Sequence, residues 1–298
     1  MNLISISDLS REEILRLIES SEAFRARRSE HGTPLAKKSL AMIFEKPSTR
    51  TRVSLEIAAA ELGGHPIYLS AGELQLGRGE TIADTARVLS RYVHGITARV
   101  FSHNTVVQLA RFASVPVVNA LSDFEHPLQI LADLQTMSQK FSKLEGLKVA
   151  WIGDGNNVCN SMILAAAILG MDITVASPQG YQPKARILEQ AKSLGGWPKV
   201  VVEPDEAASG ADVLVTDTWV SMGDEAQEAE RLRVFGKYQL NSRIMELAGP
   251  EAIALHCLPA HRGQEITDEV MDGPQSAVFD EAENRLHTSK AVMAWLMR

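Results

Sequence analysis

The sequence predicts an α/β protein of two doubly wound parallel-sheet domains, with the active site in the cleft between them. The chain has 298 residues, and at ~150 residues per domain this length predicts two domains. Short β-branched runs alternate with longer helical patterns, as in parallel sheets that carry helices on both faces. Polar residues directly follow several of these runs, where the carboxyl ends of parallel strands form ligand sites.

The expected strands are short and apolar: Ser39–Phe44, Pro66–Leu69, Ile96–Phe101, Val115–Asn119, Leu147–Ile152, Ile173–Ala176, Val200–Val202, Val213–Thr216 and Ile253–His256. Expected helices include Thr49–Leu62, Thr81–Tyr92, Leu128–Lys140, Asn157–Leu169, Lys184–Leu194 and a final one from about Arg285. We place the domain boundary after the helical pattern that begins at Pro127. The domains are then 1–143, completed by the final helix at about 284–298, and 144–283.

Composition excludes several classes of protein. The net charge is −7, with 45% hydrophobic and 22% charged residues, which is ordinary for a globular protein and disfavours nucleic acid or an anionic membrane as a partner. No apolar run approaches the ~18 residues of a membrane-spanning helix, and the N-terminus lacks the pattern of a signal peptide. We therefore expect a cytoplasmic protein. The two cysteines, Cys159 and Cys257, form neither a disulfide framework nor a zinc pattern.

A Ser/Thr/Arg run gives the clearest indication of a ligand site in the first half. Ser48-Thr49-Arg50-Thr51-Arg52 stands between an expected strand and an expected helix. Ser48 is a good N-cap, the first helical turn attracts anions, and an arginine fork matches phosphate oxygens. A capped helix with surface arginines is the alternative, but five such residues in a row favour a phosphate site.

Further polar residues of the first half lie near expected strand ends. Arg99 stands in an otherwise apolar strand, where it either serves a ligand or forms a structural salt bridge. His126-Pro127-Leu128-Gln129 opens a helix, so His126 is either a ligand contact or a simple cap. The glycine-rich segment 72–80, which includes Gln75, is expected to be a mobile loop that closes over a ligand, or else a solvated turn.

In the second half, Gly153-Asp154-Gly155 follows a strand, but Val158 stands where a dinucleotide fingerprint requires a third glycine. The adjacent amides of Asn156 and Asn157 suit a zwitterionic head group better than a pyrophosphate. Asp217 and Cys257 each follow a strand and could together bind an amino group, although a buried apolar role is the alternative for Cys257.

A metal site at His256, Cys257 and His261 lacks the paired ligand spacing of zinc sites. We therefore expect no metal.

Four motifs, in order along nearly the whole chain, resemble those of the aspartate/ornithine carbamoyltransferase family. They are Ser48-Thr49-Arg50-Thr51-Arg52, His126-Pro127-Leu128-Gln129, Asp217 with Ser221-Met222-Gly223, and His256-Cys257-Leu258-Pro259. The last two motifs are similar to those of the ornithine branch of this family. The resemblance implies transfer of the carbamoyl group of carbamoyl phosphate to the side-chain amine of L-ornithine, which yields L-citrulline and phosphate. It also implies a homotrimer or a multiple of trimers.

The resemblance implies the following site residues. Carbamoyl phosphate would be bound by Ser48, Thr49, Arg50, Thr51, Gln75, Arg99, His126, Gln129, Cys257, Leu258 and Arg285. Ornithine would be bound by Asn157, Asp217, Ser221 and Met222. The catalytic residues would be Arg99, His126, Asp217 and Cys257.

The chemistry of these residue types agrees with that reaction. A side-chain amine has a pKa of about 10.4 and must lose a proton before it attacks, which Asp217 or Cys257 can assist. Arg99 and His126 can stabilise the oxyanion on the carbonyl. Positioning and electrostatics suffice for such a transfer, so we expect no cofactor.

Other function classes remain open at the level of sequence. The chain could carbamoylate putrescine, an acylated ornithine or aspartate, although Cys257 and the loop after Asp217 disfavour each of these acceptors. It could also be a dehydrogenase or a non-enzymatic binding module, because a sheet type does not fix a function.

Overall fold

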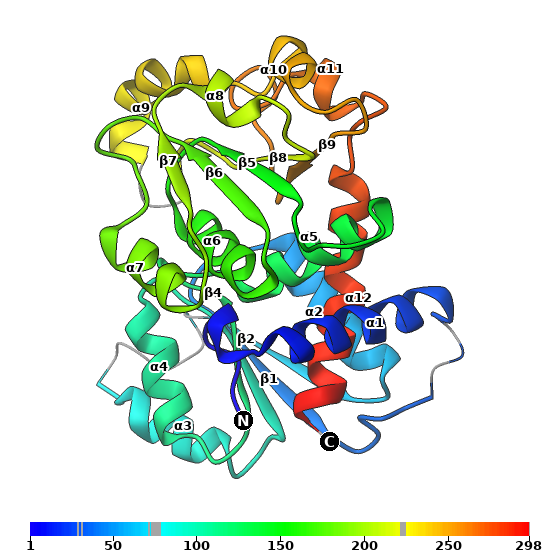
Figure 1. The fold of residues 1–298 in the computed structure, drawn as a ribbon. Coiled ribbons are helices and arrows are strands. Elements are labelled where there is room, and N and C mark those ends of the chain that lie inside the picture. The colour runs from blue at the N-terminus through cyan, green and yellow to red at the C-terminus, as the bar shows by residue number, and fades with distance from the viewer. Residues whose placement is uncertain (29, 31, 71, 73–78, 221–224, 298) are drawn as a thin grey trace. The chain divides into compact units, whose positions relative to one another are not determined.

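The structure is a computed structural model that describes residues 1–28, 30, 32–70, 72, 79–220 and 225–297 (Figure 1). Its contacts divide the chain into two compact units. Unit 1 comprises Met1–Gln135 and Glu283–Arg298, and unit 2 comprises Thr136–Ala282. Each unit has its own parallel sheet, which confirms the predicted α/β class. Among the described residues, no helix has the length and apolar character needed to cross a membrane.

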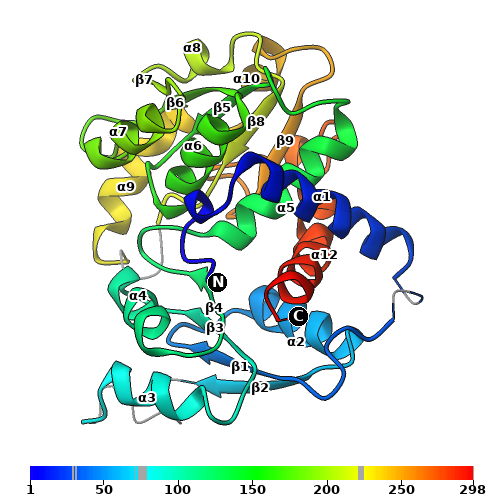
Figure 2. The same cartoon turned by 60° about the horizontal axis from the view of Figure 1, so that its bottom comes forward.

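Unit 1 contains a four-stranded parallel sheet in the order β2-β1-β3-β4. Its strands are β1 (Ser39–Phe44), β2 (His65–Ser70), β3 (Gly95–Arg99) and β4 (Val117–Leu121). Its helices are α1 (Arg11–Ala26), α2 (Thr49–Glu61), α3 (Ile82–Leu89), α4 (His103–Phe112), most of α5 (Pro127–Lys140) and most of α12 (Val278–Leu296), with the 3₁₀ turn η1 (Ile6–Asp8). Figures 1 and 2 show α3 and α4 on one side of the sheet and α2 and α12 on the other.

Unit 2 contains a five-stranded parallel sheet in the order β7-β6-β5-β8-β9. Its strands are β5 (Lys148–Ile152), β6 (Asp172–Ala176), β7 (Lys199–Val201), β8 (Val213–Thr216) and β9 (Ile253–His256). Its helices are α6 (Asn157–Leu169), α7 (Ala185–Ser193), α8 (Pro204–Ala208), α9 (Glu228–Phe235), α10 (Ser242–Leu247) and α11 (Asp268–Met271), with the 3₁₀ turns η2 (Glu225–Gln227) and η3 (Gly236–Tyr238). In both views α6 and α7 cover one face and α8 and α10 the other.

The central strands form where the sequence is continuously apolar. Every residue of β8 and β9 is buried, as are all but the first residue of β1 and β5. Strands of a parallel sheet that is covered on both faces have this pattern, because neither side of the strand meets water. The polar residues that end or directly follow these strands therefore stand at the carboxyl edge of each sheet.

Several element boundaries differ from the sequence prediction. Strand β4 runs from Val117 to Leu121 where Val115–Asn119 was expected, and α3 ends at Leu89 and not at Tyr92. Strand β3 ends at Arg99, not at Phe101, because Ser102 accepts a hydrogen bond from the Asn104 N–H and caps α4. Phe101 is 52% exposed between the two elements. The last helix begins at Val278, where Asp280 and Glu281 in its first turn complement the helix dipole. The prediction near Arg285 was therefore late by about two turns.

Helices α1, α4, α8, α9, α10 and α11 lie outside the expected set. A capping box starts α1, in which the side chains of Ser10 and Glu13 accept each other's backbone N–H groups. That box is readable in the sequence as Ser-x-x-Glu.

Candidate active site

The N-terminus of α2 in unit 1 has the features of an anion site. Ser48 caps the helix, its Oγ accepting from the Thr51 N–H at 3.3 Å. Thr51 is buried, whereas Thr49 and Arg50 are exposed. Among the described residues, none forms a hydrogen bond or an ion pair with the Arg50 guanidinium. The free amides of the turn and this guanidinium can therefore both be offered to a phosphate.

Arg52, the second arginine of the Ser/Thr/Arg run, has the contacts of a surface arginine. Arg52 Nε lies 2.9 Å from Glu56 Oε1, and its guanidinium lies 3.9 Å from the centre of the Tyr68 ring. Within the Ser/Thr/Arg run, Arg50 is thus the arginine that remains available to a ligand.

Arg99 lies beside Thr51 because β3 is the neighbour of β1. The register pairs Phe44 with Arg99 at the carboxyl ends of these strands. Arg99 Nη1 points to Thr51 Oγ1 at 3.5 Å, and both residues are buried, with 6% and 2% of their surface exposed. A buried guanidinium next to a hydroxyl is a suitable donor group for a carbonyl or phosphate oxygen.

His126 and Gln129 lie after β4, at the start of α5, near Arg285 of α12. Arg285 Nη1 donates to Gln129 Oε1, and Gln129 Nε2 donates to Asp133 Oδ1 at 2.8 Å. Burial lowers the pKa of His126 well below its usual value, and the positive charges of Arg285 and Arg99 lower this pKa further. His126 is therefore a neutral imidazole beside two cations, so negative charge that develops there would be stabilised.

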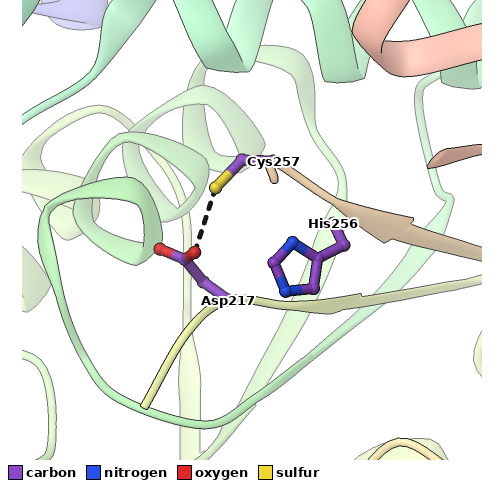
Figure 3. Close-up of side chains that lie close together, drawn as sticks. All are labelled: Asp217, His256 and Cys257. Atoms are coloured by element: carbon purple, nitrogen blue, oxygen red, sulfur yellow. Dashed lines mark hydrogen bonds between the residues drawn. The ribbon is translucent and has the colours of Figure 1, made fainter. Parts of the chain in front are cut away.

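In unit 2, Asp217 and Cys257 follow the adjacent strands β8 and β9, which pair Thr216 with His256 (Figure 3). Asp217 is 7% exposed. Its Oδ1 accepts from Cys257 Sγ at 3.0 Å and from the Thr218 N–H at 2.8 Å, and its Oδ2 accepts from Asn156 Nδ2 at 2.7 Å. Donors to both oxygens fix the orientation of the carboxyl group. The arrangement combines a fixed negative charge with a thiol, which suits a cationic amine.

The glycine turn before α6 serves chain packing. A Cβ atom on Gly155 would lie 2.3 Å from the Pro183 backbone nitrogen, so only glycine fits there. Asp154 accepts from Arg231 Nη1 at 2.8 Å, and Asn156 caps α6 by accepting from the N–H groups of Val158 and Cys159. These contacts explain why Gly155 and Asp154 stand in this turn, and they require no bound dinucleotide.

Asp217, His256 and Cys257 form a group whose potential metal-ligand atoms lie within 4.8 Å of one another. Both ring nitrogens of His256 are already used, however. Nδ1 accepts from the Leu258 N–H at 2.9 Å, and Nε2 lies 3.0 Å from Glu265 Oε1. His261 Nδ1, the other candidate ligand, lies 3.2 Å from Thr218 Oγ1. These atoms satisfy one another, and the group does not fit a metal centre.

The predicted residues thus fall into two clusters, one in each unit. The unit 1 cluster consists of Ser48, Thr49, Arg50, Thr51, Arg99, His126, Gln129 and Arg285. The unit 2 cluster consists of Asn156, Asn157, Asp217, Cys257 and Leu258. The predicted residues Gln75, Ser221 and Met222 lie outside the described residues.

The structure adds residues that the sequence did not single out. Asp133 orients the Gln129 amide from one turn further along α5. Asn156, expected to offer its amide to a head group, holds Asp217 with its side-chain Nδ2. Glu265 holds His256. For Asn156 its place at a helix N-cap and for Asp133 its place in an apolar stretch were the available indications, whereas Glu265 lies in a polar segment that gives none.

Two family models cover the chain. The carbamoyl-P binding domain of aspartate/ornithine carbamoyltransferase matches residues 1–139, and the Asp/Orn binding domain of the same family matches residues 145–296. The chain belongs to the aspartate/ornithine carbamoyltransferase family. The resemblance predicted from the four motifs is therefore confirmed, as is the carbamoyltransferase class.

Individual relatives in this family are similar over their whole length. The chain is 57% identical to the ornithine carbamoyltransferase of Methanosarcina mazei, an alignment that covers 100% of this chain and 99% of the relative. The structure of ornithine carbamoyltransferase from Pyrococcus furiosus has a TM-score of 0.96 at 49% identity, covering 99% of this chain and 96% of that one. A structure of N-acetyl-L-ornithine transcarbamylase has a TM-score of 0.90 at 32% identity, covering 99% of both chains.

Proposed function

We propose that the chain transfers the carbamoyl group of carbamoyl phosphate to the side-chain amine of L-ornithine, giving L-citrulline and phosphate. The observation that carries this proposal is the carboxyl group of Asp217, held by three hydrogen bonds beside the Cys257 thiol. A carboxylate at this place attracts a cationic amine and repels the carboxylates of aspartate. The relatives at 50–57% identity that are named ornithine carbamoyltransferase support the same acceptor.

We assign carbamoyl phosphate to the unit 1 cluster. Arg50, the hydroxyls of Ser48, Thr49 and Thr51, and the amides of the first turn of α2 bind the phosphate. Arg99 and neutral His126 donate to the carbonyl oxygen, and Gln129 binds the carbamoyl amide with Arg285 at its side. Gln75 is proposed to close the phosphate site. In this assignment the domain of residues 1–143, completed by 284–298, binds the first substrate.

We assign ornithine to the domain of residues 144–283. Asp217 binds the side-chain amine, and Asn157, Ser221 and Met222 bind the head group. Cys257 and Leu258 contact both substrates where they meet. The two clusters must serve a single pair of substrates for the transfer to occur.

The reaction forms one bond and breaks another. The neutral amine nitrogen attacks the carbonyl carbon, the C–N bond forms, and the negative charge that develops on the carbonyl oxygen is stabilised by Arg99, His126 and Thr51. The bond from this carbon to the phosphate oxygen then breaks, and phosphate leaves towards Arg50. Asp217 and Cys257 hold the amine and receive its proton directly or pass it on. The residues supply orientation and electrostatic stabilisation, and no cofactor is proposed.

The test is the formation of citrulline and phosphate in equal amounts from carbamoyl phosphate and ornithine. Asp217→Asn keeps the shape of the side chain but removes its charge, so we expect a KM for ornithine at least about tenfold higher. The affinity for carbamoyl phosphate should change little, because the groups assigned to its phosphate and carbonyl oxygens lie in unit 1. Absence of citrulline with the unmodified enzyme would contradict the proposal.

We further propose a homotrimer or a multiple of trimers, located in the cytoplasm and serving arginine metabolism. The resemblance to the family supports this assembly. Sedimentation at assay concentrations tests it, and a fully active monomer would contradict it.

A further inference from the structure

We propose that His256 and Glu265 are positioning residues that hold the turn carrying Cys257 and Leu258 in the conformation that the acceptor side requires. The inference rests on the proposed function, because the acceptor is taken to be ornithine. Neither His256 nor Glu265 belongs to the expected substrate contacts. Their role is to fix the backbone and thereby the direction of the Cys257 thiol.

The hydrogen bonds of His256 define its tautomer. Its ring is fully buried at the end of β9, where Nδ1 accepts from the Leu258 N–H at 2.9 Å. A backbone N–H can only donate, so Nδ1 carries no hydrogen and the proton of the neutral ring is on Nε2. Nε2 then donates to Glu265 Oε1 at 3.0 Å. The carboxylate thus selects the tautomer that can hold the Leu258 amide.

Glu265 also fixes the far end of the same turn. Its Oε1 accepts from the His261 N–H at 2.6 Å as well as from His256, so one buried oxygen ties both ends of residues 256–261 together. A second buried carboxylate, Glu281, accepts from the backbone N–H of His256 at 2.9 Å. Apolar side chains would fill these positions without the cost of desolvating two carboxylates. We therefore explain Glu265 and Glu281 by the turn conformation that their hydrogen bonds impose.

The turn needs this support because of the backbone at Leu258. Its φ is 57°, in the left-handed region that non-glycine residues seldom adopt. Cys257 stands between this residue and His256, and its Sγ points to Asp217 Oδ1 at 3.0 Å (Figure 3). If the bond from Leu258 to the ring is lost, the turn can relax and the thiol leaves Asp217.

Two pairs of substitutions separate positioning from simple packing. His256→Phe retains a buried ring but no acceptor, so the Leu258 N–H loses its partner. His256→Asn is smaller, yet its side-chain oxygen can accept from the N–H two residues further on, as in an Asx turn. Glu265→Gln retains an accepting Oε1. Its matched variant, Glu265→Leu, has a side chain of similar size without an acceptor.

We expect His256→Phe and Glu265→Leu to reduce kcat/KM for ornithine by about tenfold or more. His256→Asn and Glu265→Gln should recover most of this loss. The affinity of all four for carbamoyl phosphate, measured by calorimetry, should change much less than kcat/KM for ornithine, because the turn supplies only Cys257 and Leu258 to that substrate and its phosphate ligands lie in unit 1. Tyr238→Phe is the control, because it removes the bond from Tyr238 Oη to the Val202 carbonyl in unit 2 but leaves the turn intact. It should reduce the melting temperature without changing kcat/KM.

A second readout does not depend on turnover. The rate at which iodoacetamide alkylates Cys257, followed by mass spectrometry, reports where the thiol lies. Beside Asp217 the negative charge opposes the reactive thiolate, so His256→Phe should accelerate alkylation and His256→Asn should restore the slow rate. Equal rates in all variants would overturn the inference, even if the enzyme made no citrulline. A failed citrulline assay would overturn only the proposed function. A loss of activity equal in His256→Phe and His256→Asn would also overturn the inference.

Discussion

Side chains of opposite charge characterise the two clusters. Unit 1 presents Arg50, Arg99 and Arg285 with a neutral His126, in a chain whose net charge is −7. Unit 2 presents the carboxylate of Asp217. The first combination suits a phosphate and a developing oxyanion, and the second suits a protonated amine.

Arg50 is expected to be the principal phosphate ligand. Arg50→Ala should weaken carbamoyl phosphate by about 1.5–3 kcal/mol for each charge-assisted hydrogen bond lost. The melting temperature should be unchanged, because Arg50 has no partner among the described residues. Arg52→Ala is the matched control on the same helix and should change the affinity little, since Arg52 pairs with Glu56. Calorimetry on both variants checks this, and equal losses of affinity would refute the assignment.

The buried His126 predicts how stability depends on pH. Its pKa is lowered in the folded protein, so the unfolded chain takes up a proton first as the pH falls below about 6.5. The free energy of unfolding should therefore decrease as the pH falls, and His126→Asn should make this decrease shallower. The pKa of His287 is also lowered. Because His287 is present in both proteins, its contribution to the pH dependence is the same in each and cancels in the comparison. Denaturant titrations between about pH 8 and about pH 5 measure the slopes. Identical slopes would rule out this contribution.

The sequence singles out candidate site residues whose type and position after a strand already suggest a function. Ser48 to Thr51, Asp217 and Cys257 are of this kind. It missed the contact of Asn156 with Asp217, because that contact depends on tertiary folding. It missed Glu265, although its partners His256 and His261 are only nine and four positions away, because the polar residues around it do not indicate a buried carboxylate. Asn156 and Asp217 are separated by 61 positions, and only the adjacency of β5 and β8 brings their loops together.

At the scale of elements, buried strands were the most predictable. The bounds of β1, β8 and β9 agree with the sequence prediction, since a continuous apolar run ends abruptly at a polar residue. The end of β3 and the start of α12 were wrong, because a serine cap and an acidic first turn determine them and the apolar pattern does not. Helix α1 has a polar exposed face and a weak apolar pattern, so only its capping box marked it.

The cap of α2 should have two separable effects. Ser48→Ala removes the bond to the Thr51 N–H and should cost about 1 kcal/mol of stability, together with a loss of carbamoyl phosphate affinity. Ser102→Ala removes the corresponding cap of α4, where Ser102 accepts from the Asn104 N–H, so it should cost a similar stability but no affinity. Thermal melts and calorimetry on the pair test this. If the affinity falls equally in both, Ser48 acts only as a structural cap.

At the scale of the whole molecule, the two sheets separate the two kinds of chemistry. Each unit forms its own parallel sheet, and each sheet places its cluster where strands end. This architecture follows from the alternating pattern of the sequence. The acceptor does not follow from the architecture, because a transcarbamylase named for N-acetyl-L-ornithine has nearly the same fold, with a TM-score of 0.90. Side chains and not sheets must therefore distinguish the acceptors.

The comparison of acceptors on one enzyme preparation tests the central claim most directly. Carbamoyl transfer is measured at saturating carbamoyl phosphate with ornithine, putrescine, N-acetylornithine and aspartate in turn. Ornithine should have the highest kcat/KM, and aspartate should not react, because its carboxylates would be brought towards Asp217. Faster transfer to any of the other three would show that the chain carries the proposed chemistry but uses a different substrate.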